Sequence, residues 1–205
     1  MKKDILVAAI IGFLVALLLL VIKLTGNIDR LNRLPYVEYS LVAFPLLAAL
    51  GIAVASALGK RVRIVFQGAK FLLVGVLNTF LDLGVLNILT AATGVTGGIL
   101  FAVFKGFTFL LAVANSYLWN KYWTFSSRKG TSQDFVAQGK EFAQFLVISG
   151  VGFFLNVGTA SAVVNFIEPQ FGLSERAWPT AGALAGTLVV LTWNFLGYKL
   201  IVFKR

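Results

Sequence analysis

Apolar segments long enough to cross a lipid bilayer recur along the 205-residue chain, and they limit its fold more than any other feature. The first of them, residues 5–24, carries a single charged residue, Lys23, near its end. About 20 apolar residues suffice for an α-helix to span the hydrocarbon core. Hydrophobic residues make up 59% of the sequence, which is more than a soluble domain of this length can bury. The sequence therefore predicts an all-α integral membrane protein.

Six segments have this apolar character. We predict six transmembrane helices over residues 5–24, 41–58, 70–92, 100–123, 142–166 and 181–203. The first could instead be a signal peptide, but it is too long for one and no small-residue cleavage site follows it. We therefore expect it to be retained. The best candidate for a flexible loop is the polar stretch of residues 126–140.

The formal net charge of +10 is distributed unevenly over these predicted helices. With both termini on the cytoplasmic side, most Lys and Arg residues fall on that side. Those at or beyond the other side are Lys23, Arg30, Arg33 and Arg176. This positive-inside bias explains the basicity, so the charge does not indicate nucleic acid binding. We expect a multi-pass protein of the cytoplasmic membrane.

Cysteine and histidine do not occur in the sequence. Disulfides, the usual zinc sites and catalytic Ser–His or Cys–His pairs are therefore excluded. Asp82 is the one acidic residue inside a predicted helix, and a lone carboxylate lacks the second acid or base of most general acid–base schemes. We expect no enzyme activity, no metal site and no cofactor.

The last four predicted helices contain an internal repeat. Residues 71–84 (FLLVGVLNTFLDLG) align with residues 145–158 (FLVISGVGFFLNVG) at a shift of 74 positions, which places Asp82 opposite Asn156. Residues 114–125 align with residues 192–203 at a shift of 78 positions, which places Lys121 opposite Lys199. Both hairpins enter the membrane from the same side. We therefore predict a parallel tandem repeat of helical hairpins, with any substrate site at the repeat interface.

These segments resemble the GtrA-like family of small four-helix membrane proteins. The resemblance rests on KFLLVGVLNTFLDLG (70–84), NSYLWNKYWTF (115–125), QFLVISGVGFFLNVG (144–158) and NFLGYKLIVF (194–203). It covers residues 68–205 as a four-helix domain, and it leaves residues 1–67, two extra helices and a basic linker, with an open role. The resemblance implies translocation of a polyprenyl-phosphate-linked monosaccharide to the outer face, for glycosylation of cell-surface polysaccharide.

Each of the last four predicted helices carries a polar stripe. Asn78 and Asp82 are one helical turn apart, and a rise of ~1.5 Å per residue places Asp82 near the bilayer midplane. Lipid does not tolerate such a face, so we expect a bundle with a polar interior. The predicted substrate-binding residues are Asn78, Asp82, Lys105, Asn115, Asn156 and Asn194. Asp82 and the asparagines could also join helices without touching substrate, and Lys105 could extend to the outer head groups.

Lysine and aromatic residues gather at the predicted inner surface. Lys70, Lys121 and Lys199 could bind a lipid phosphate there, or they could only determine topology. We expect Trp123 and Tyr198 to contribute to an aromatic belt at the same level.

Two functions are compatible with these patterns. The first is a flippase for a polyprenyl-phosphate sugar, with membrane lipids around it. The second is a membrane anchor that positions a partner glycosyltransferase and transports nothing. Four core helices make a narrow path, so a homodimer is a further expectation that the sequence leaves open.

Overall fold

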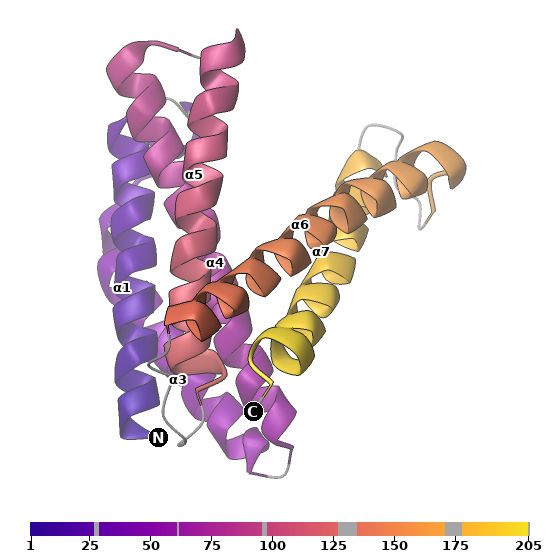
Figure 1. Cartoon of the computed structure of the whole chain (residues 1–205). Helices are drawn as coiled ribbons and strands as arrows, with labels where there is room; N and C mark the ends of the chain where they lie inside the picture. The colour runs from indigo at the N-terminus through magenta and orange to yellow at the C-terminus, as the bar shows by residue number, and fades with distance from the viewer. Residues whose placement is uncertain (27–28, 61, 96–97, 127–134, 171–177, 205) are drawn as a thin grey trace. The chain divides into compact units, whose positions relative to one another are not determined.

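In a computed structural model, the described residues form a series of helices (Figure 1). The described backbone covers residues 1–26, 29–60, 62–95, 98–126, 135–170 and 178–204, and no strand occurs in these ranges. Side chains are described for these residues except 29, 30, 63, 98, 101, 102, 105, 135, 136, 138, 157, 160, 161, 164 and 178–184. The chain divides into two compact units, Met1–Ser126 and Ser127–Arg205.

The first unit joins the N-terminal helices to the first of the two C-terminal hairpins. Its long helices are α1 (Lys2–Leu24), α3 (Ser40–Gly59), α4 (Arg63–Thr93) and α5 (Gly98–Trp119). The short helices α2 (Asp29–Asn32) and η1 (Val37–Tyr39) lie between α1 and α3. α1 packs against both α3 and α4, and α5 packs against α4. One apolar core includes Ile11 of α1, Ile52 of α3 and Val74 of α4.

The second unit is a helical hairpin of α6 (Phe135–Phe166) and α7 (Trp178–Gly197). Its core centres on Phe145, which is fully buried and stacks on Tyr198 with ring centroids 4.1 Å apart. The indole N–H of Trp193 donates to the carbonyl of Ile148 across the hairpin at 3.0 Å. These contacts join the two helices near the end of α7.

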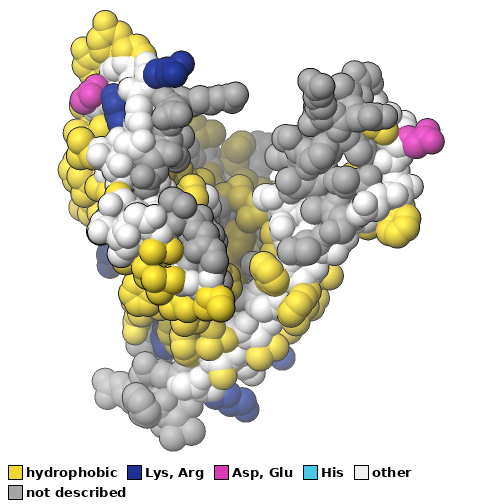
Figure 2. Space-filling model, turned by 90° about the horizontal axis from the view of Figure 1, so that it is seen from above, with side chains coloured by type: hydrophobic (Ala, Val, Ile, Leu, Met, Phe, Trp, Pro, Cys, Tyr) yellow, Lys and Arg dark blue, Asp and Glu magenta, His cyan; other side chains and the backbone are white. Residues whose placement is uncertain are grey.

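Several described helices are long and apolar enough to cross a membrane. By length and composition they are Lys2–Leu24, Val37–Gly59, Ile64–Thr93 and Ala185–Val202. Hydrophobic side chains cover much of the visible described surface, and charged side chains on it are few (Figure 2). Leu46, Leu47 and Leu50 of α3, for example, are each more than 60% exposed. Such surfaces are stable in lipid and not in water, so the structure confirms an all-helical membrane protein.

Two helices begin earlier than the sequence predicts. α4 begins at Arg63 and not at residue 70, and α6 begins at Phe135 and not at residue 142. The predicted basic linker before α4 is therefore mostly helical, and part of the predicted loop before α6 is helical as well. Neither segment contains proline, and a single interior glycine weakens a helix by only ~1 kcal/mol. The apolar pattern predicts that each helix begins where its apolar run begins, but these first turns lie before that point in the sequence.

α5 and α7 both end in a turn of π-helix. α5 continues as η2 (Asn120–Thr124) and α7 continues as η3 (Tyr198–Val202). Backbone hydrogen bonds close the turns, from Phe125 N–H to the Asn120 carbonyl at 2.9 Å and from Phe203 N–H to the Tyr198 carbonyl at 2.7 Å. The shift of 78 positions that aligns the two sequences also aligns these turns. The apolar pattern predicts ordinary helix here and gives no sign of the change.

A phenylalanine follows each π turn, and its ring packs against the other helix of the same hairpin. Phe125 lies against Phe71 of α4, with ring centroids 6.5 Å apart at 49°. Phe203 lies against Phe145 of α6, with ring centroids 6.2 Å apart at 57°. η2 also packs on α4, as η3 packs on α6. Both hairpins are thus fastened at one end by similar aromatic contacts.

The same turns bury two aromatic residues that we expected at the membrane surface. Trp123 is 7% exposed and belongs to the core shared with α1, and Tyr198 is 4% exposed. Tyr122 is 57% exposed, as a belt residue should be. The belt prediction is wrong for Trp123 and Tyr198, because π-helical geometry rotates them toward the neighbouring helix.

The crossing of α1 and α3 yields a stability prediction. A Cβ at Gly12 would overlap the carbonyl of Phe44, whereas a Cβ at Gly51 meets nothing within 4 Å. We expect Gly12→Ala to lower the free energy of unfolding by about 1–3 kcal/mol, because the backbones must separate. Gly51→Ala, also on a membrane helix, should leave it unchanged or raise it slightly. Equilibrium unfolding in detergent micelles measures both, and equal stabilities would contradict the close packing.

Candidate functional site

Two polar contacts join α4 to α5 within the apolar part of the first unit. The hydroxyl of Thr108 donates to Oδ1 of Asp82 at 2.6 Å. The amide of Asn115 donates to Oδ1 of Asn78 at 2.7 Å. Thr108 is fully buried, and the other three residues are half-buried. The predicted polar face of this hairpin is therefore real for these residues, and it points toward the neighbouring helix.

The spacing along each helix explains why these four side chains meet. Asn78 and Asp82 are four residues apart on α4, and Thr108 and Asn115 are seven apart on α5, so each pair lies on one face. Consecutive helices of a hairpin run antiparallel, and the earlier residue of α4 therefore meets the later residue of α5. Buried between apolar side chains, each polar group would be costly without its partner. The pairs fix the register of α4 against α5.

The second hairpin places glycine where the first has a polar partner. Asn156 corresponds to Asp82 in the repeat alignment, and Gly186 corresponds to Thr108. A Cβ at Gly186 would lie 2.5 Å from the carbonyl oxygen of Asn156 and 3.3 Å from its amide nitrogen. A Cβ at Gly152 would lie 2.5 Å from Oδ1 of Asn194 in the same way. Asn156 and Asn194 therefore sit at close helix crossings within this unit.

The three predicted phosphate-binding lysines have different surroundings. Lys121 is 3% exposed, its ammonium group donates to the Tyr117 hydroxyl at 2.7 Å, and it lies 5.0 Å from that ring's centroid. Lys199 is half-buried and lies 5.7 Å from the centroid of Phe195. Both are cation–π contacts with a residue one turn earlier. The second lacks the hydroxyl partner, so Lys199 is the more accessible of the two cations.

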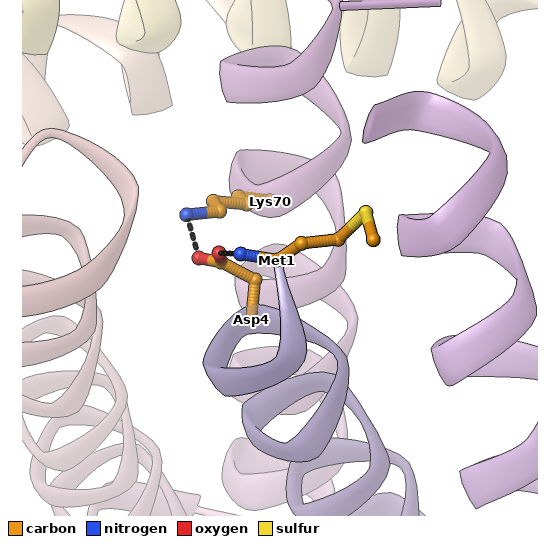
Figure 3. A network of polar contacts seen from close by, with 3 residues as sticks. All are labelled: Met1, Asp4 and Lys70. Atoms are coloured by element: carbon orange, nitrogen blue, oxygen red, sulfur yellow. Dashed lines mark hydrogen bonds and ion pairs between the residues drawn. The ribbon is translucent and has the colours of Figure 1, made fainter. Parts of the chain in front are cut away.

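Lys70 is buried in an ionic contact that the sequence does not predict. Its ammonium group pairs with Oδ1 of Asp4, in the first turn of α1, and Oδ2 of Asp4 lies 3.3 Å from the amine of Met1 (Figure 3). Lys70 is 7% exposed, and it lies 4.5 Å from the Phe66 ring centroid and 5.1 Å from that of Trp123. The one signal in the sequence is that Asp4 and Lys70 both lie at the start of a predicted transmembrane helix, at the predicted inner surface.

The side chain of Lys105, one of the predicted substrate-binding residues, lies outside the described residues. Among the described residues, no cluster of three acidic, His or Cys side chains could hold a metal ion. An apolar groove also opens between α1, α3 and α4, lined by Val15, Phe44 and Val76 among others. This groove contains none of the predicted polar site residues.

Comparison with protein families agrees with the family resemblance seen in the sequence. The family model described as "GtrA/DPMS, transmembrane domain" matches residues 70–203, well over half of the chain. The chain belongs to the GtrA/DPMS transmembrane-domain family. The match begins at Lys70, so α1 and α3 lie outside the GtrA/DPMS domain although α1 contacts α4.

A bacterial relative supports the same assignment. The chain is 29% identical over 138 residues to "Uncharacterized membrane protein YngA" of Bacillus subtilis (strain 168). The similarity covers 65% of this chain and 77% of the relative. No solved structure matches the chain significantly. The family assignment therefore rests on the sequence of the GtrA/DPMS domain.

The contact between Asp82 and Thr108 can be measured in a double-mutant cycle. Between Thr108→Val and Asp82→Leu we expect a coupling of about 0.5–2 kcal/mol, the range of interhelical hydrogen bonds in membranes. Thr79→Val with Asp82→Leu is the matched control, because the Thr79 hydroxyl donates within α4, to the Gly75 carbonyl at 3.0 Å. Unfolding in detergent micelles gives both couplings. Equal couplings would show that the Thr108 hydroxyl contributes nothing specific.

Proposed function

We propose that this GtrA/DPMS protein moves a polyprenyl-phosphate-linked monosaccharide across the cytoplasmic membrane, for glycosylation of cell-surface polysaccharide. The observation that carries the proposal is the pair of polar contacts in the first hairpin, Asp82–Thr108 and Asn78–Asn115. Sugar hydroxyls both donate and accept hydrogen bonds, as these side chains do. A hydroxyl group could therefore replace a side-chain partner, so that the polar groups stay paired while the sugar passes.

The proposed architecture has six transmembrane helices, both termini cytoplasmic, with the last four as a parallel tandem repeat. Support for the repeat comes from features that recur at matching positions. These are the π turns η2 and η3, the two phenylalanine contacts that they make, and the lysines that stack on a ring one turn earlier. In such parallel repeats, substrates bind at the repeat interface. Asn156 and Asn194 are proposed as the second hairpin's share of that site, and Lys105 as a cation nearer the outer surface.

For the lipid phosphate, the local surroundings favour Lys199 as the point of first contact. Lys121 is buried with a hydroxyl partner and Lys70 already has a carboxylate partner, whereas Lys199 is half-buried and, among the described residues, lies over the ring of Phe195. An incoming phosphate needs a cation that it can reach without first displacing a neighbour. Lys121 and Lys70 would take part after such a displacement.

The alternative is a membrane anchor that positions a glycosyltransferase without transport. The apolar exposed faces of α3 suit either function, since a partner's helix or lipid could cover them. The purified protein in liposomes distinguishes the two. A flippase moves the glycolipid without a partner, whereas an anchor moves none and co-purifies with the enzyme.

The transport proposal predicts a specific effect at Asp82. In proteoliposomes containing a polyprenyl-phosphate sugar, we expect Asp82→Asn to slow flipping about ten-fold, because the amide replaces one acceptor oxygen by a donor and changes the pairing with sugar hydroxyls. Thr79→Val, on the same helix, should flip at the parental rate. Flipping is measured by the access of a membrane-impermeant reagent to the sugar. Parental rates for Asp82→Asn and for Lys105→Ala would reject the roles given to these residues.

The proposed role of Lys199 as the first lysine to contact the lipid phosphate predicts a second effect. Lys199→Ala should raise the substrate concentration that gives half-maximal flipping by about ten-fold, because one phosphate contact is lost. Lys204→Ala removes an exposed positive charge close by in the sequence and is the matched control. Equal effects of the two substitutions would mean that only the general positive charge of the inner surface matters.

A further inference from the structure

Buried polar atoms without partners gather in η2 at the end of α5. Among the described residues, no hydrogen-bond partner is available to Oδ1 of Asn120, Nε1 of Trp123 or Oγ1 of Thr124. The three residues are 0%, 7% and 4% exposed, so water does not reach these atoms freely. Buried polar groups are nearly always paired, and an exception calls for an explanation. Two of these atoms are donors, an indole N–H and a hydroxyl.

A buried cation lies beside Trp123, the residue that carries one of these donors. The ammonium group of Lys70 is 5.1 Å from the Trp123 ring centroid and forms an ion pair with Asp4 (Figure 3). A carboxylate has only two oxygens. In Asp4 one contacts Lys70 and the other faces the amine of Met1, which leaves the η2 donors unpaired.

We propose that Lys70, Trp123 and Thr124 form a site for the phosphate of a lipid head group, and that Asp4 is an internal anion which occupies it at rest. The proposal uses the proposed function only in taking a phosphate-bearing lipid as the ligand. It gives α1, which lies outside the family match, a regulatory role: its first turn competes with the ligand.

The chemistry of the site suits phosphate better than carboxylate. A phosphate monoester has three terminal acceptor oxygens, one more than a carboxylate, and carries at least one negative charge, so it could accept from the ammonium, the indole N–H and the hydroxyl together. Lys70 is too buried to lose its anion without a replacement, because an unpaired buried charge is strongly unfavourable. Departure of Asp4 and arrival of phosphate are therefore coupled.

The position of Asp4 allows such an exchange. It lies in the first turn of α1, its side chain is 23% exposed, and Lys2 and Lys3 beside it are exposed. Terminal turns of helices open with little cost in free energy. Asp4 can therefore leave for water while the rest of α1 stays packed on α3 and α4.

The test is equilibrium binding of a polyprenyl phosphate to the purified full chain in detergent, measured by native mass spectrometry. We expect Asp4→Asn to tighten binding about five-fold or more, since the competing charge is removed. Asp4→Glu, which keeps the charge, should show little gain. Lys70→Met added to Asp4→Asn should return the affinity to the parental value or below. A purely structural Asp4–Lys70 pair predicts the opposite, with binding unchanged or weaker in Asp4→Asn, and that result would overturn the proposal.

Two further variants keep the test decisive if Asp4→Asn folds poorly. Thr124→Val removes a buried hydroxyl that has no hydrogen-bond partner among the described residues, so the fold should tolerate it, and we expect binding to weaken by about three-fold or more. Unchanged binding in Thr124→Val would overturn the site. Glu38→Gln is the matched control, because it breaks the Lys23–Glu38 pair (3.5 Å) at the other end of α1 and should not alter binding.

Parallel titrations identify the source of the phosphate. A gain in Asp4→Asn with phosphatidylglycerol as large as with polyprenyl phosphate indicates a general anionic-lipid site, and a gain with inorganic phosphate indicates that the anion alone suffices. These titrations measure binding and not transport, so the two proposals can fail separately. If the protein binds the lipid phosphate but does not flip the glycolipid, only the proposed transport is rejected. If the protein flips the glycolipid but Asp4→Asn binds the lipid phosphate no more tightly than the parent, only the role of Asp4 as an internal anion is rejected.

Discussion

A polar group inside an apolar bundle needs a partner, and the first hairpin depends on this requirement. α4 and α5 can slide past one another without much change in apolar contact, but only one register pairs Asp82 with Thr108 and Asn78 with Asn115. Any other register would leave polar groups in an apolar environment at a cost of several kcal/mol. The polar pairs thus define the hairpin against which α1 and η2 are packed. The same groups are the natural points at which a hydroxylated ligand could compete.

The two hairpins of the GtrA/DPMS domain share their ends and differ in the middle. Both close with a π turn, a phenylalanine contact and a lysine over an aromatic ring. Between these ends, the first hairpin uses hydrogen-bonded side chains, and the second uses Gly152 and Gly186 to bring helices close to Asn194 and Asn156. The first hairpin is therefore specified by polar pairing and the second by close backbone approach.

The sequence predicts the helices and the polar face of α4 well, because both depend on local periodicity. It predicts neither the early start of α4, where a mixed segment of polar and apolar residues precedes the predicted helix, nor the π turns, which preserve the apolar pattern while rotating it. The burial of Trp123 follows from that rotation and could not be deduced from its position in the sequence. The Asp4–Lys70 pair joins residues 66 positions apart, and only the packing of α1 on α4 brings them together. Long-range pairs of this kind need a three-dimensional structure.

The π turns also bear on how such a hairpin tolerates insertions and deletions. A π turn holds one more residue than an α-turn, and in an α-helix each residue advances the chain by about 100°. Loss of one residue from Asn120–Thr124 would let an α-turn form and would swing Phe125 away from Phe71. The number of residues between the last polar pair and the terminal phenylalanine is therefore fixed by geometry. It is fixed as firmly as the identities of the paired residues and of the phenylalanine. Homologous hairpins should therefore vary in length at the opposite end and not within this turn.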